Sequence, residues 1–168
     1  MDTRTSLRDY QRDLAERLRN AQGAANASML GVQVDDEAWL VDLREAGEVI
    51  PVPPITPLPL TRPWFRGVAN VRGNLYSVVD FAAFLGAGVC EGGAEARILL
   101  LGERFRSGAA LLVDRALGLR NPAELRAREP AAGARAWLRG EYEDDSGRWS
   151  ELDVAALVRD AEFLAVGN

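Results

Sequence analysis

Residues 64–81 read WFRGVANVRGNLYSVVDF, and this stretch decides how the whole chain is interpreted. Most of its positions are apolar, which indicates strands that enter a core. The middle of the stretch, from Asn70 to Gly73, interrupts this pattern with an amide, an arginine and a glycine. A buried guanidinium without a partner is costly, so Arg72 needs either a carboxylate partner or a path along its strand to solvent.

The end of this stretch predicts a strand that runs into a short capped helix. Asp80 is placed to cap a helix over residues 81–85, and Gly86 is placed to end it. A similar unit recurs near the C-terminus, because YSVVDFAAFL (76–85) aligns with WSELDVAALV (149–158) and Asp153 stands where Asp80 does. We therefore expect one strand-to-helix unit in each of two similar β lobes.

The remaining pattern consists of short strands in hairpins. One hairpin is expected around Asp35–Glu37, a second joins ILLLGER to ALLVDRALGL, and a third turns at Asp144–Gly147. Residues 122–135 are predicted to be an irregular connection. Many short strands with glycine-rich turns favour closed or nearly closed barrels.

The segment PVPPITPLPL (51–60) holds five prolines in ten residues. Proline lacks the N–H that a sheet interior requires, so this segment should run extended over the surface. We favour a fixed crossover loop over a proline-rich ligand for another domain.

An amphipathic helix is predicted over residues 6–21, with Ser6 as its N-cap. Its apolar face consists of Leu7, Tyr10, Leu14, Leu18 and Ala21. Most stripes of this kind face a core, so packing against the body is preferred to docking on a partner.

Composition excludes several classes of chemistry. The 168 residues include no histidine, and all 20 basic side chains are arginine. Imidazole-based catalysis, a Schiff base and a Walker-A lysine are therefore impossible. The net charge of −5 argues against nucleic-acid binding. Cys90 is the single cysteine, and we interpret it as a tolerated thiol rather than a nucleophile. The sequence shows neither a transmembrane run nor a signal peptide, so a cytoplasmic protein without membrane insertion is expected.

The stretch at residues 64–81 resembles the signature of the CheW-like domain family. The matching positions are Gly67, Val68, Asn70, Val71, Arg72, Gly73, Val78, Val79 and Asp80. The resemblance implies a mainly β fold of two SH3-like, five-stranded β-barrel lobes over residues 28–168, with short capping helices. Residues 1–25 would form a helical N-terminal extension. Ser77 and Phe81 depart from the family pattern, which often has proline and leucine there.

The same resemblance implies a non-enzymatic adaptor without a cofactor or metal. Such a protein bridges the cytoplasmic tip of a chemoreceptor and the regulatory domain of a CheA-type histidine kinase, at membrane-associated receptor arrays. The chain is most similar to adaptors of type IV pilus systems, for which the receptor would be PilJ-like and the output twitching motility. The resemblance places the partner interface at Glu48, Gly67, Val68, Asn70, Arg72 and Gly73.

Several residue roles stay open at this point. The resemblance implies a partly buried ion pair between Glu48 and Arg72 that fixes the two lobes, whereas Arg72 alone could reach solvent. Gly67 and Gly73 serve either simple turns or close backbone contacts. Asn70 bonds either local backbone or a partner.

Two other functions compete with the pilus adaptor. One is a CheW-type coupling protein of flagellar chemotaxis. The other is a carboxylate-based hydrolase built on Glu141, Glu143, Asp144 and Asp145, which lacks an accompanying oxyanion or phosphate-binding loop.

Overall fold

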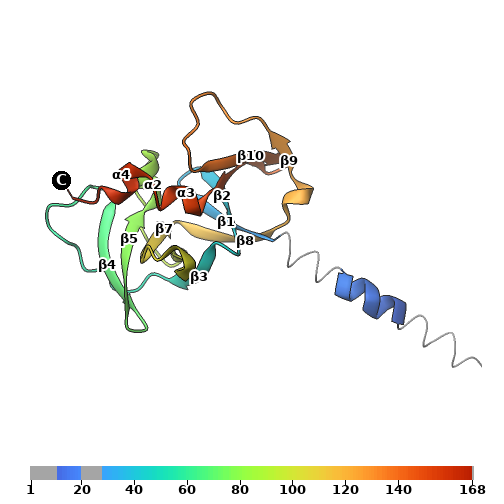
Figure 1. Ribbon diagram of the computed structural model, residues 1–168, viewed down its shortest axis with the longest axis horizontal. Coiled ribbons are helices and arrows are strands. Elements are labelled where there is room, and N and C mark those ends of the chain that lie inside the picture. The colour runs from blue at the N-terminus through green and yellow to red at the C-terminus, as the bar shows by residue number, and fades with distance from the viewer. Residues whose placement is uncertain (1–10, 20–27, 168) are drawn as a thin grey trace, which may run out of the picture.

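The computed structural model describes residues 11–19 and 28–167, and the second of these segments forms two sheets side by side (Figure 1). The first sheet contains, in spatial order, β8 (Arg115–Arg120), β1 (Met29–Val34), β2 (Glu37–Asp42), β11 (Gly147–Leu152), β10 (Leu138–Asp144) and β9 (Arg126–Arg128). The second contains β3 (Ala46–Pro51), β6 (Arg97–Leu101), β7 (Ala109–Val113), β5 (Asn74–Asp80) and β4 (Phe65–Val71). The short helices are α2 (Phe81–Leu85), α3 (Val154–Leu157) and α4 (Ala161–Leu164), with 3₁₀ turns η1 (Glu103–Phe105) and η2 (Pro122–Glu124).

The predicted mainly β architecture with two lobes is confirmed, with one difference in strand number. The second sheet has the expected five strands, whereas the first has six. The extra strand is β9, which lies in the connection predicted to be irregular and pairs antiparallel with the outer edge of β10. Both arginines of β9 lie beside Glu143 of β10, so opposite charges favour this pairing.

The predicted second hairpin is only half correct. Strands β6 and β7 do pair antiparallel, but the arm ALLVDRALGL divides at Asp114 into β7 and β8, which belong to different sheets. Asp114 forms this joint because its N–H donates to Gln33 O at 3.0 Å and its carboxylate accepts from Asp35 N at 2.6 Å. The β1–β2 turn thus holds the chain where it crosses between lobes.

The repeated strand-to-helix unit occurs in both lobes. Asp80 ends β5 and its side chain accepts a hydrogen bond from Ala83 N at the start of α2, and Asp153 does the same for Ala156 N in α3. The strand before each helix also makes a parallel pair, β5 with β7 and β11 with β2. A further short helix, α4, follows α3, and the side chain of Asp160 caps it by accepting hydrogen bonds from Glu162 N and Phe163 N.

A continuous apolar core joins the lobes. Trp39 from the first sheet lies edge-on against Phe81 of α2, with ring centroids 5.2 Å apart, and both rings contact Trp137. All three side chains are buried. Aromatic burial of this size dominates the packing energy, so the lobes form one folded unit.

The N-terminal helix is described at residues 11–19, and Ser6, Leu7, Tyr10 and Ala21 lie outside the described residues. Leu14 and Leu18 are 47% and 55% exposed. The preferred interpretation, in which this apolar face packs on the body, is therefore wrong for the described part of the helix. Figure 1 shows that segment standing apart from both sheets.

None of the helices described in residues 11–19 and 28–167 is long and apolar enough to cross a membrane.

Candidate partner interface

Arg72 lies in the turn between β4 and β5 and not inside a strand. Val71 pairs with Asn74, which leaves Arg72 and Gly73 as a two-residue loop. Both residues have positive φ, 51° and 87°, the conformation of a type I′ hairpin turn. The Asn70 side chain accepts a hydrogen bond from Gly73 N at 2.9 Å, so this amide bonds local backbone. The polar middle of the opening stretch is therefore a turn that presents an arginine.

The Arg72 guanidinium meets Glu48 of β3 in a bidentate ion pair. Arg72 Nη1 donates to Glu48 Oε2 at 2.7 Å, and Nη2 donates to Oε1 at 2.6 Å. The hydrogen bonds from Arg72 hold the pKa of Glu48 below its usual value, and the same contact raises the pKa of Arg72. This parallel fork is the geometry in which arginine recognises a carboxylate most specifically.

The position of this pair differs from the expectation in one way. The side chains of Arg72 and Glu48 are 69% and 42% exposed, so the pair lies at the surface with Glu48 partly covered. Glu48 lies on β3 and Arg72 on the β4–β5 turn of the same lobe, so the pair joins two parts of one lobe and does not fix the lobes to each other. Exposed pairs add little to stability, which leaves these two charges available to a partner.

A cleft of about 240 Å³ lies beside the ion pair. Its walls include Glu48 and Arg72 together with Tyr76 of β5 and Leu100 of β6. Aromatic and aliphatic side chains next to a charged pair offer both an apolar contact and a directional polar one, as partner surfaces commonly do.

Gly67 and Val68 lie further along β4, where they hold the proline-rich segment. Thr56 N donates to Val68 O at 2.8 Å and Val68 N donates to Thr56 O at 2.9 Å. Gly67 has a φ of 132°, and a Cβ at this position would lie 2.6 Å from Thr56 C. Gly67 therefore serves a close backbone contact, whereas Gly73 has open space around it and serves the turn.

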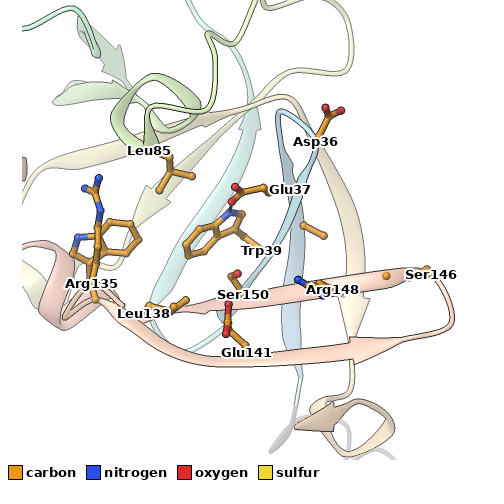
Figure 2. Close-up of a pocket in the computed structure, with 13 residues that line it drawn as sticks. Asp36, Glu37, Trp39, Leu85, Arg135, Leu138, Glu141, Ser146, Arg148 and Ser150 are labelled. Carbon is orange, nitrogen blue, oxygen red and sulfur yellow. Dashed lines mark hydrogen bonds between the residues drawn. The ribbon is translucent and has the colours of Figure 1, made fainter. Parts of the chain in front are cut away.

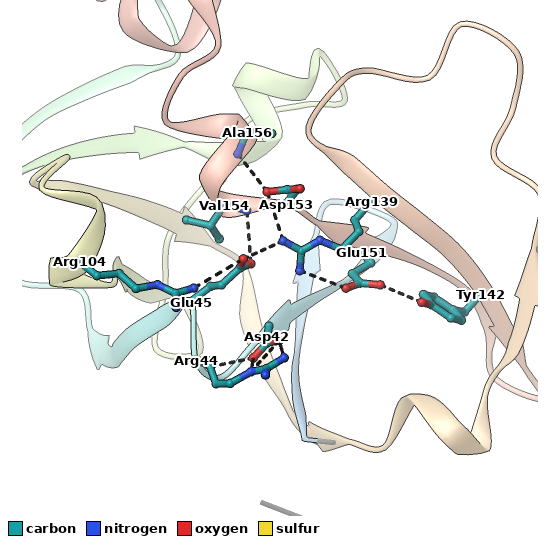
Figure 3. Close-up of polar contacts among 10 residues, drawn as sticks. All are labelled: Asp42, Arg44, Glu45, Arg104, Arg139, Tyr142, Glu151, Asp153, Val154 and Ala156. Atoms are coloured by element: carbon teal, nitrogen blue, oxygen red, sulfur yellow. Dashed lines mark hydrogen bonds and ion pairs between the residues drawn. The ribbon is translucent and has the colours of Figure 1, made fainter. Parts of the chain in front are cut away.

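A polar cluster between the lobes was not predicted. Arg139 of β10 donates to Glu45 Oε1 at 2.7 Å and also reaches Glu151 and Asp153, at 3.4 and 3.2 Å (Figure 3). Glu45, in the connection from β2 to β3, is buried, and its other carboxylate oxygen accepts from Val154 N at 3.4 Å. One guanidinium thus joins three carboxylates, one from the connection between β2 and β3 and two from the end of β11.

Sequence reasoning had no local signal for this cluster, since Glu45 and Arg139 are 94 positions apart. Asp153 was predicted only as a helix cap. Its second contact, to Arg139, depends on the packing of β10 beside α3, which no local pattern in the sequence predicts.

As the pH falls into the acid range, we expect the free energy of unfolding to decrease less in Asp153→Asn than in the wild type. Burial acts to raise the pKa of Asp153, but the hydrogen bond from Ala156 N and the charge of Arg139 outweigh it, so the pKa is lowered. A carboxyl with a lowered pKa contributes stability above its unfolded pKa and loses that contribution as pH falls through its folded pKa.

Urea unfolding at about pH 7, 4 and 3 checks this, because the gap between wild type and Asp153→Asn should be widest at about pH 7 and narrow below about pH 4. A gap that stays constant with pH would contradict the assignment.

Three of the four carboxylates considered for catalysis have structural partners, and one of them, Glu141, accepts a hydrogen bond from Ala131 N at 3.2 Å. Glu143 pairs with Arg126 and Arg128, and Asp144 accepts hydrogen bonds from Ser146 N and Gly147 N in its own turn. Burial raises the pKa of the Cys90 thiol to about 11, which disfavours the nucleophilic thiolate. Within residues 11–19 and 28–167, no group of acidic or cysteine side chains is arranged to hold a metal ion.

Comparison with known proteins places this geometry in a family context. The family model described as CheW-like domain matches residues 28–162. The chain is 33% identical to Protein PilI of Pseudomonas aeruginosa over 111 residues, which are 66% of this chain and 62% of that protein. It is also 33% identical to Chemotaxis protein CheW of Thermotoga maritima over 91 residues, 54% of this chain and 59% of that protein. The chain therefore spans about three fifths of the length of both relatives.

A solved structure shares the fold. The crystal structure of the scaffolding protein TtCheW from Thermoanaerobacter tengcongensis superposes with a TM-score of 0.62, covering 75% of this chain and 88% of that one. The two sequences are 19% identical, so this likeness concerns the fold alone.

Proposed function

This chain belongs to the CheW-like domain family, and on that premise we propose that it is a non-enzymatic adaptor in chemosensory signalling. It couples the cytoplasmic tip of a chemoreceptor to the regulatory domain of a CheA-type histidine kinase. In this proposal residues 1–25 are an extension, residues 28–168 are the adaptor domain, and the protein works in the cytoplasm at receptor arrays. No cofactor or nucleic acid takes part.

The observation that carries the proposal is the exposed Glu48–Arg72 pair beside its cleft. Most exposed ion pairs are flexible and poorly specific, but this one is bidentate and stands on the hydrogen-bonded β4–β5 turn. We assign the receptor contact to this surface, with Asn70 and Gly73 shaping the turn and with Gly67 and Val68 holding the adjoining segment.

Arg72→Glu is expected to abolish assembly of the receptor–adaptor–kinase complex while the fold survives. The change places two carboxylates side by side and removes the planar fork, yet the pair lies at the surface, so the free energy of unfolding should change little. The measurement is ternary assembly by co-sedimentation with receptor fragments and kinase, alongside urea unfolding.

The matched control is the charge swap Glu48→Arg with Arg72→Glu, which restores the pair in reverse. If the role of the pair is to shape the surface, the swap recovers assembly. If Arg72 itself meets a carboxylate of the receptor, the swap stays inactive. Wild-type assembly by Arg72→Glu alone would refute the proposed surface.

We favour the type IV pilus branch, with a PilJ-like receptor and twitching motility as output. The similarity to PilI extends over 66% of this chain, against 54% for the chemotaxis CheW. Binding measured against receptor fragments from a pilus system and from a flagellar system decides between the two, and preference for the flagellar fragment would select the alternative.

A further inference from the structure

The cleft beside the Glu48–Arg72 pair has a size that suits one side chain. Its volume is about 240 Å³, which is below the roughly 300–1,000 Å³ that is typical of pockets for small molecules. The residues that line it come from β3, the β4–β5 hairpin, the end of β6 and the start of η1. On a surface that meets a partner protein, a cleft of this size can receive a single protruding side chain of that partner.

The charges that line this cleft favour a cation. Glu48 and Glu103 bring two carboxylates against the one guanidinium of Arg72, a net charge of −1. Arg72 is already committed to Glu48 through two hydrogen bonds. Glu103 is exposed, and its carboxylate has neither a hydrogen bond nor an ion pair in the part of the chain that the structure describes. Glu103 is therefore the free charge of the cleft, and its complement is a positively charged group.

Two partly buried side chains form an apolar wall next to this charge. Val71 of β4 and Tyr76 of β5 pack against buried residues of the second sheet and also line the cleft. A long aliphatic stem with a charged end fits such a surface, because the stem covers apolar atoms while the charged head stays near water. Tyr76 adds an aromatic ring, to which cations are attracted. Lysine and arginine are the side chains that combine these features.

The groove shown in Figure 2 is a different kind of surface. Its volume is about 600 Å³, and it is lined by β2, α2 and the β10–β11 hairpin. Trp39, which lines it, is only 4% exposed and offers little apolar surface to a partner. Two of its carboxylates are already occupied, because Glu37 accepts from Trp39 Nε1 at 3.1 Å and Glu141 accepts from Ala131 N at 3.2 Å. The smaller cleft thus provides the better site for one cationic side chain.

We propose that the receptor inserts one lysine or arginine side chain into the cleft at Glu103. The stem of this side chain lies along Val71 and Tyr76, and its charged head pairs with the Glu103 carboxylate. This inference rests on the proposed function, since it names the group that the receptor presents to the surface that holds Arg72. The Glu48–Arg72 pair then closes one side of the cleft and leaves Glu103 to be neutralised by the partner.

Isothermal titration of the full chain with a fragment of the cytoplasmic tip of a PilJ-like receptor tests this inference. Glu103→Gln keeps the shape of the side chain and removes its charge, so we expect the dissociation constant to rise about tenfold and to depend less steeply on salt. The matched control is Glu124→Gln, because Glu124 lies in the first turn of η2 as Glu103 does in η1. This control should bind as the wild type does.

A charge scan of the receptor fragment identifies the inserted side chain. When its lysines and arginines are replaced by glutamine one at a time, one replacement should lose affinity in the wild-type chain but not further in Glu103→Gln. Additive losses at every position would overturn the inference, as would a loss in Glu103→Gln that appears only with the kinase regulatory domain.

The Arg72→Glu variant separates this inference from the proposed function. If Arg72→Glu loses the receptor fragment while Glu103→Gln binds as the wild type does, the inference fails and the receptor surface stands. If Arg72→Glu binds normally, or if the wild-type chain does not bind the fragment, both fail.

Discussion

Replacing Gly67 by alanine is expected to cost about 3–5 kcal/mol of unfolding free energy, a large share of the roughly 5–15 kcal/mol that a folded domain has. The backbone at Gly67 has a φ of 132°, which side-chain-bearing residues rarely adopt. The added methyl would also collide with the Thr56 carbonyl, at 2.6 Å from its carbon, and would lie 2.8 Å from Pro57 Cα. These are backbone atoms, so relief requires the proline-rich segment to leave the edge of β4. Urea unfolding monitored by tryptophan fluorescence measures the loss.

Gly73→Ala is the control for conformational strain without a collision. Gly73 has a φ of 87°, but a Cβ there would meet nothing within 4 Å. The expected cost is about 1–2 kcal/mol, the price of the left-handed conformation alone. Equal losses in the two variants would show that the Thr56 contact does not restrain the segment.

Arg139→Met is expected to destabilise the fold by about 2–4 kcal/mol. Methionine keeps an apolar stem but removes the guanidinium that serves Glu45, Glu151 and Asp153, and the first two carboxylates are buried. Removing one partner of a buried pair leaves the other charge poorly compensated, and Arg104 Nη2, 3.7 Å from Glu45 Oε1, compensates it only in part. The expected loss is below the full range for such pairs because Arg139 is 34% exposed, so water screens part of the effect.

Arg135→Met is the matched control. Arg135 pairs with Glu162 at 3.3 Å, and the side chains of both partners are exposed, at 45% and 59%, so its loss should cost far less than the loss of Arg139. A similar small loss for Arg139→Met would mean that water satisfies the three carboxylates. The double variant Arg139→Met with Glu45→Gln should lose less than the sum of the two single variants, because the two residues share one contact.

Local chemistry explains which elements could be predicted. The hairpins at β1–β2 and β10–β11 follow from apolar alternation around Asp-rich turns. Asp80 and Asp153 cap helices because a carboxylate beside the first turn of a helix accepts a hydrogen bond from a free backbone N–H. Strand β9 was not predicted, because its three residues show no alternation of apolar and polar side chains. Its pairing depends instead on Glu143 of the neighbouring strand. The division of ALLVDRALGL at Asp114 escaped because both halves are apolar and only their sheet partners differ.

The candidate site likewise combines residues that the sequence indicates with contacts that it does not. Its residues were named through a family signature, and nothing local in residues 64–81 indicates which carboxylate Arg72 meets or how exposed the pair is. The Glu45–Arg139 contact carried no signal at all, because a single glutamate in a turn and a single arginine in a strand are common on any surface.

What this sequence determines by itself is most of the short strands, their turns and the helices capped by Asp80 and Asp153, because periodicity and capping act over a few neighbouring residues. The tertiary structure alone decides where the charges lie. It brings the ends of one sheet together so that Glu48 meets Arg72 at the surface, and it closes Glu45 under Arg139 between the lobes. Whether an ion pair is exposed or buried depends on how distant segments cover it, and that coverage exists only after the sheets have packed.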